Sequence, residues 1–228
     1  MMNRLNRIIK KLADEQHPDG SFGRFHTENT KLKQRISTTQ AATWLMYENS
    51  LTRENDICNK TCLYMERLIN DISLWPDNWE KNKWFKPAVP FFVASSLSLF
   101  GSDDEKYDYI CRIWIEILIS AFETGEYSKE QINTTAKSLI GVEIDGSYIG
   151  LQSLYNLALY AFNAGKIPVV TQRIYLKWLH HYDGVITYTK IRPNSLSTNS
   201  EKNRVISLLE RFAGFEDEFR PANVIDFR

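Results

Sequence analysis

Residues 75–87 combine aromatic and basic side chains in a density found nowhere else in the chain. The segment holds three lysines and four aromatic residues, Trp75, Trp79, Trp84 and Phe85. Aromatic faces hold an apolar chain or stabilise a cation, and lysines attract an anionic group such as a diphosphate. The composition therefore fits the wall of a ligand pocket, or else a loop that anchors its tryptophans on neighbouring helices with its lysines in solvent.

Two further groups of residues have the types that metal sites use. Asp103, Asp104 and Asp108 carry carboxylates that magnesium would accept, but such acids also complement the dipole at a helix start, which is the interpretation that we favour. Cys58 and Cys62 lie one helical turn apart and would supply two zinc ligands, although buried free cysteine is common in protein cores. We expect no metal and no cofactor, and the sequence identifies no catalytic residue.

The composition restricts the function classes. The 228 residues carry 28 basic and 28 acidic side chains, which argues against nucleic acid as a partner despite the aromatic and basic residues of the 75–87 segment. An odd, low count of three cysteines favours a reducing compartment, so we expect a cytoplasmic location. No apolar stretch reaches the ~20 residues that span a bilayer, which predicts no transmembrane segment.

Apolar residues recur at helical spacing along most of the chain, whereas alternating strand-like patterns are few. The fold class is therefore predicted to be all-α, and short connections between the helices favour antiparallel helical hairpins. A capping box over residues 128–131 marks one helix start. The predicted organisation is a helical-hairpin domain at 1–192, a flexible linker at 193–203, and a C-terminal helix and tail at 204–228.

An Asp-Gly turn occurs three times, each time followed by an aromatic or apolar residue. The turns are Asp19-Gly20-Ser21-Phe22, Asp145-Gly146-Ser147-Tyr148 and Asp183-Gly184-Val185-Ile186. In such a turn we expect the aspartate to accept hydrogen bonds from the turn backbone and the glycine to adopt a positive φ. The aromatic or apolar side chain after the turn is expected to pack on a neighbouring helix and so to hold the turn against it.

The surroundings of the first turn resemble a known repeat. A helical pattern over residues 8–15 ends at Gln16, and Phe22 and Phe25 follow. This arrangement resembles the glutamine-aromatic repeat of the terpenoid cyclase and protein prenyltransferase superfamily, although the two phenylalanines stand where that repeat usually carries tryptophan. The resemblance implies a short or partial α/α toroid of helical hairpins, with inner helices rich in small residues and leucine. Segments of that composition begin at Thr38, Pro90 and Gly150.

Two functions of different classes fit this sequence. In the first, implied by the resemblance, an aromatic-lined cavity binds an isoprenoid or another apolar, lipid-like ligand. If it is an enzyme, the protein would then be prenyltransferase-like or terpene cyclase-like, although the Asp-x-Asp-Asp and Asp-Asp-x-x-Asp motifs of such enzymes are absent. The predicted substrate-binding residues are Trp44, Trp79, Trp84, Phe91 and Tyr148 in the wall and Lys86 near the head group.

In the second function, the protein is a non-enzymatic helical-repeat scaffold that binds a protein partner. Its concave surface would form the contact, or its C-terminal tail, which carries Phe215, Phe219 and Phe227. The two functions differ in a property of shape. A ligand-binding protein requires a closed apolar pocket that contains the tryptophans, whereas a scaffold requires a shallow groove.

Overall fold

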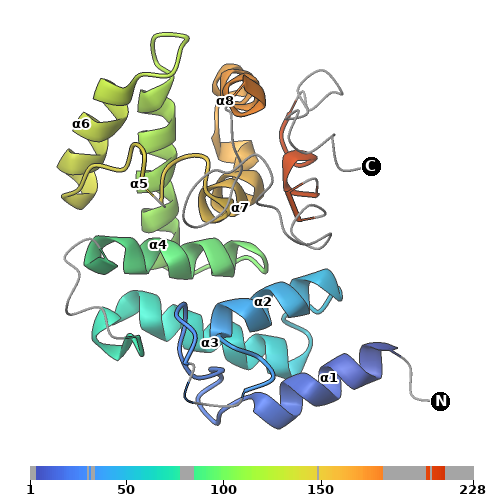
Figure 1. The fold of residues 1–228 in the computed structure, drawn as a ribbon. Helices are drawn as coiled ribbons and strands as arrows, with labels where there is room; N and C mark the ends of the chain where they lie inside the picture. Colours follow the sequence, from blue (N-terminus) through green and yellow to red (C-terminus); the bar gives the residue numbers. More distant parts are fainter. Residues whose placement is uncertain are drawn as a thin grey trace. The chain divides into compact units, whose positions relative to one another are not determined.

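The computed structural model describes residues 4–29, 31, 34–77, 85–147, 149–181, 204–205 and 207–213 of the chain. Regular secondary structure in these ranges is entirely helical, which confirms the predicted all-α class (Figure 1). Among the described helices, none combines the length and the apolar composition that crossing a membrane requires. The helices are α1 (Arg4–Glu15), α2 (Thr39–Glu48), α3 (Asp56–Asn70), η1 (Ile72–Leu74), α4 (Phe85–Ser98), α5 (Glu105–Ala121), α6 (Lys129–Ile140), α7 (Leu154–Phe162), η2 (Ala164–Lys166) and α8 (Val169–His181).

Packing divides the chain into two compact units, Met1–Asp108 (unit 1) and Tyr109–Arg228 (unit 2). The linker predicted at 193–203 and the phenylalanine-containing tail lie outside the described residues. Helical backbone is present at 204–205 and 207–209, where the sequence predicted a C-terminal helix. The boundary at residue 192 and the toroid arrangement stay predictions.

The core of unit 1 is formed by α2, α3 and α4, each of which packs against the other two (Figure 1). Helix α4 is the most enclosed, because every side chain from Ala88 to Ser98 except Pro90 is buried. A helix that is buried on all sides lies at the centre of its unit. Helix α1, by contrast, buries only Leu12 and is an amphipathic helix at the surface of the unit.

The segments in which the sequence predicted inner helices lie in α2 and α4 or lead into α7. Every residue of α7 from Tyr155 to Ala161 is buried. Helix α2 buries polar side chains as well as apolar ones, and these must find hydrogen-bond partners inside the protein. The Thr43 hydroxyl, for example, donates to the backbone oxygen of Gln40 at 2.8 Å. Each of these segments therefore contributes buried residues to its unit, whereas their place as inner helices of a toroid stays a prediction.

Buried tyrosines join the helices of unit 2. The Tyr160 hydroxyl on α7 donates to the backbone oxygen of Trp114 on α5 at 3.1 Å. The Tyr175 hydroxyl on α8 donates to the backbone oxygen of Leu151 at 2.7 Å. Burial raises the pKa of both hydroxyls, so both stay protonated and serve as donors.

The described C-terminal residues pack on the helices of unit 2, to which they belong. The Phe212 side chain is buried, and the Arg211 guanidinium lies 3.8 Å from the centre of the Phe162 ring. The Ala213 N–H donates to the side-chain oxygen of Gln172 on α8 at 2.8 Å. A cation over an aromatic ring adds an electrostatic attraction to this apolar contact, so the segment is held by three kinds of interaction.

The predicted capping box at the start of α6 is half formed. The Ser128 hydroxyl accepts from the Gln131 N–H at 3.2 Å, as predicted. The reciprocal bond is missing, because the Ser128 N–H donates to the backbone oxygen of Ala121 at 2.8 Å instead. The Gln131 side-chain oxygen has no hydrogen-bond partner within the described residues. The start of α6 is therefore fixed by the serine alone.

Candidate functional site

The turn after α1 is pressed closely against α3. The side-chain nitrogen of Gln16 donates to the backbone oxygen of Ile57 at 2.8 Å and to the Thr61 hydroxyl at 2.9 Å. The same hydroxyl donates to the backbone oxygen of Gly20 at 3.0 Å. Gly20 has a φ of +93°, and a Cβ atom at this position would lie 2.2 Å from the backbone oxygen of Lys60. Only glycine fits so close to another backbone in this conformation.

The two described Asp-Gly turns share their backbone conformation but differ in how they are held. Glycine adopts a positive φ in both, as predicted, and Phe22 after the first turn is buried. In the first turn, Asp19 accepts from the Ser21 N–H at 2.9 Å, also as predicted. In the second, the prediction is wrong, because the Asp145 carboxylate accepts from the Tyr127 hydroxyl and pairs with Lys129 at 3.3 Å instead. The third turn and the Tyr148 plug lie outside the described residues.

A buried carboxylate fastens the loop that follows the first turn. Asp77 is 4 % exposed, and its carboxylate accepts from the N–H groups of Phe25 at 2.8 Å, His26 at 3.3 Å and Thr27 at 2.6 Å. The Thr27 hydroxyl donates to it as well. Consecutive backbone N–H groups that converge on one anion form a concave anion-binding arrangement, here occupied by a side chain of the protein itself. The loop that carries Arg24 is thereby fixed in place.

The His26 side chain is enclosed on the inner side of this loop. Its ring stacks on Phe92 of α4, with centroids 4.4 Å apart, and its Nδ1 lies 3.0 Å from the side-chain oxygen of Gln40. Burial lowers the pKa of the imidazole, whereas the hydrogen bond to Gln40 and the charge of Asp77 act in the opposite direction. Burial prevails, so the folded protein favours the neutral ring.

This lowered pKa predicts a loss of stability in mild acid. The unfolded chain binds the His26 proton more readily than the folded protein does. The contribution of the neutral ring is therefore complete above about pH 6.5 and is lost as the pH falls through the folded-state pKa. We expect His26→Asn, which keeps a donor for Gln40 but does not titrate, to have a flatter stability curve than the wild type. Urea unfolding at intervals from pH 7 to pH 5 measures both, and parallel curves would contradict the assignment to His26.

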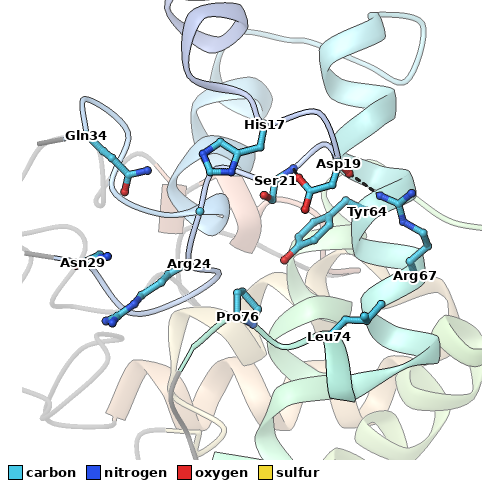
Figure 2. Close-up of a pocket in the computed structure, with 11 residues that line it drawn as sticks. His17, Asp19, Ser21, Arg24, Asn29, Gln34, Tyr64, Arg67, Leu74 and Pro76 are labelled. Atoms are coloured by element: carbon cyan, nitrogen blue, oxygen red, sulfur yellow. Dashed lines mark hydrogen bonds between the residues drawn. The ribbon is translucent and has the colours of Figure 1, made fainter. Parts of the chain in front are cut away.

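A pocket of about 560 Å³ opens where the turn, the loop and α3 meet (Figure 2). Tyr64, on α3, is almost completely buried, whereas His17 and Arg67 are exposed, so the pocket runs from the surface inward. Most of the lining side chains are polar. The lining residues are His17, Asp19, Ser21, Gly23, Arg24, Asn29, Gln34, Tyr64, Arg67, Leu74 and Pro76.

The charged and polar groups of the pocket are arranged around the Tyr64 hydroxyl. In Figure 2, this hydroxyl points toward the middle of the hollow, with Asp19 and Ser21 beside it and Arg24 and Arg67 on opposite sides. Arg67 donates to the backbone oxygen of Asp19. Burial and the neighbouring negative charge of Asp19 raise the pKa of the Tyr64 hydroxyl, so it remains a donor at neutral pH.

The residues predicted to bind substrate lie elsewhere or outside the described part of the chain. Phe91 is fully buried in α4 and Trp44 is 7 % exposed on α2, and neither side chain lines this pocket. Trp79, Trp84 and Tyr148 lie outside the described residues, as does the side chain of Lys86. Their role in a substrate wall stays a prediction.

The residues considered for metal binding have structural roles where they are described. Asp104 accepts from the N–H groups of Lys106 at 2.9 Å and Tyr107 at 3.1 Å at the start of α5, and so acts as a helix cap. Cys58 and Cys62 are fully buried on α3. Within the ranges that the structure describes, no three His, Cys, Asp or Glu residues lie close enough together to hold a metal ion.

Comparisons of the chain with protein-family models, with curated proteins and with solved structures find no match. The assignment of a site therefore rests on the geometry of the pocket. Sequence reasoning singled out the first turn but missed Tyr64 and Arg67, which read as ordinary positions of an amphipathic helix. Gln16 and Gly20 offered a signal, because a glutamine at the end of a helix and a glycine in a tight turn indicate that another backbone lies close to the turn. That neighbour is α3, which carries Tyr64 and Arg67.

Proposed function

We propose that the protein binds a small molecule through an anionic group in the pocket between the first turn and α3. The observation that carries this proposal is that two guanidinium groups, those of Arg24 and Arg67, line one pocket that contains a single carboxylate, Asp19. Its volume of about 560 Å³ lies within the range of small-molecule sites, roughly 300–1,000 Å³. A surplus of positive charge in such a space favours an anionic ligand.

Both arginines keep donors for a ligand. A guanidinium has five N–H donors, and neither arginine forms an ion pair with a carboxylate among the described residues. Within the described part of the chain, Arg24 donates only to the backbone oxygen of Glu28 at 3.4 Å, which is a long bond, whereas Arg67 makes a short bond of 2.5 Å to the backbone oxygen of Asp19. Arg24 is therefore the stronger candidate to anchor the anion, because its donors are less firmly engaged within the protein.

The isoprenoid ligand implied by the sequence resemblance is compatible with this site at one end only. An isoprenoid diphosphate carries an anionic head group that Arg24 could bind in a bidentate manner. Its apolar chain would find only Leu74 and Pro76 among the fully apolar side chains of the lining. We therefore propose the pocket as the binding site of an anionic group, without assigning a catalytic step to it.

Replacing Arg24 with glutamine tests the proposal. We expect Arg24→Gln to weaken the binding of inorganic pyrophosphate and of farnesyl diphosphate by about tenfold or more, because a charge-assisted hydrogen bond is lost. Isothermal titration calorimetry on the intact protein measures both affinities. Arg173→Gln, an exposed position on α8 in unit 2, is the matched control and should change neither. Equal affinities in the two variants, or no binding by the wild type, would refute the proposal.

If the protein is instead a scaffold, the alternative function, we expect it to carry a bound protein and no small molecule in the cell. Native mass spectrometry of the freshly purified protein separates the two. A small anion that dissociates under denaturing conditions supports the ligand-binding proposal. A second protein bound in fixed stoichiometry, with no small molecule present, supports the scaffold instead.

A further inference from the structure

We propose that the ligand of this pocket is a sugar phosphate, so that the anionic group occupies the Arg24 side and hydroxyl groups of the ligand occupy the Asp19 and Tyr64 side. This inference rests on the proposed anion site and names its ligand class. It follows from the polar groups of the pocket that the protein does not itself use. A sugar phosphate differs from an isoprenoid diphosphate in carrying polar groups along its whole length.

Several polar groups of the lining have no hydrogen-bond partner within the described residues. The Tyr64 and Ser21 hydroxyls and the His17 imidazole donate to and accept from no other group there. Of the two carboxylate oxygens of Asp19, only Oδ1 accepts, from the Ser21 N–H. None of these groups is among the buried side-chain atoms that lack a hydrogen-bond partner, so in the free protein they are open to water in the pocket. A ligand that displaces this water has to supply hydrogen bonds of its own to these groups, because a polar group that loses its water and stays unpaired is unfavourable.

These groups match the hydrogen-bonding pattern of sugar hydroxyls. A hydroxyl of a sugar is both a donor and an acceptor, and it is best bound where a carboxylate oxygen and an O–H or N–H donor lie side by side. Asp19 supplies the acceptor, and Tyr64 and Arg67 supply donors beside it (Figure 2). An apolar chain at this position would leave the Tyr64 hydroxyl and the second carboxylate oxygen of Asp19 unpaired.

The charges of the pocket are distributed as a ligand with one anionic end and one hydroxyl-bearing end requires. The carboxylate of Asp19 repels an anion but accepts from a neutral hydroxyl. The Arg24 guanidinium lies on the other side of the Tyr64 hydroxyl in Figure 2. A ligand with its anionic group at one end and hydroxyls at the other therefore has one favoured orientation, whereas a second anionic group near Asp19 would be disfavoured.

Calorimetry with glucose 6-phosphate, inorganic phosphate and farnesyl diphosphate tests the inference on the full chain. We expect the affinity for glucose 6-phosphate to be higher than that for phosphate by about tenfold or more, since the sugar adds hydrogen bonds to the same anion contact. Asp19→Asn should weaken glucose 6-phosphate binding, because the amide accepts less strongly than the carboxylate. The same variant should leave phosphate binding unchanged or tighter, because a negative charge has been removed.

Two further variants keep this test decisive. Tyr64→Phe retains the buried ring and removes only the hydroxyl, so it should also affect the sugar phosphate alone. Asp103→Asn, at an exposed position outside the pocket, should affect neither probe. The inference is overturned if glucose 6-phosphate binds no more tightly than phosphate, or if farnesyl diphosphate binds most tightly, while the anion site itself stands. Absence of binding by every anion overturns the proposed function and this inference together.

Discussion

Replacing Gly20 with alanine is expected to lower the free energy of unfolding of the protein by about 3 kcal/mol or more. The added Cβ would lie 2.2 Å from the backbone oxygen of Lys60, so either the turn or α3 has to move. Movement would break the bonds that Gln16 and Thr61 make across this contact. The φ of +93° adds a conformational penalty for any residue with a side chain. Urea denaturation measures the effect.

Gly146 provides the matched control, because it belongs to the second Asp-Gly turn. Its φ is +69°, but a Cβ atom there would meet nothing within 4 Å. Gly146→Ala therefore carries the conformational penalty without the collision, and we expect it to cost about 1 kcal/mol. If the two alanine variants lose the same stability, the close approach of the first turn to α3 does not contribute and the description of that contact is incorrect.

Asp77→Ala is expected to destabilise the protein by about 3 kcal/mol, because it leaves the N–H groups of a half-buried loop without their acceptor. The N–H groups of Phe25 and Thr27, at 2.8 and 2.6 Å from the carboxylate, lose the shortest of these bonds. Hydrogen exchange should therefore accelerate at these two amides. Because the same loop carries Arg24, binding of pyrophosphate should weaken as well.

Asp71→Ala is the control for the loss of a carboxylate near the same part of the chain. Asp71 is exposed and accepts from the N–H and the hydroxyl of Ser73, so water can replace it. We expect a cost of about 1 kcal/mol or less and no change in hydrogen exchange at the loop. Protection of the Phe25 and Thr27 amides that survives in Asp77→Ala would show that the carboxylate is not what holds them.

The helices could be predicted from sequence because local signals determine them. Apolar spacing defines the buried face of α3, and Ser128 caps α6 through a contact only three residues long. The first turn could be predicted for the same reason, since Asp19 bonds to Ser21 within it. The half-formed capping box shows the limit of such signals, because a backbone bond from Ser128 to Ala121, at the end of α5, replaced the bond within the box.

The candidate site depends on contacts that no local pattern encodes. Asp77 bonds to residues about fifty positions earlier in the chain, and nothing in its neighbourhood distinguishes it from a solvated acid. Tyr64 has the spacing of a core residue and is almost completely buried, yet it also lines the pocket. Aromatic composition drew attention to Trp44 and Phe91, but large apolar side chains on central helices are above all core residues.

Contacts between distant parts of unit 1 hold the walls of the pocket together, and this has a consequence for the rates of folding and unfolding. Gln16 and Thr61 are 45 residues apart, and Phe25 and Asp77 are 52 apart, so neither contact can form until most of the unit has collapsed. Helices α3 and α4 can form earlier, from local contacts. We therefore expect the site to assemble late in folding and to open early in unfolding. A ligand that binds it would slow unfolding without accelerating folding.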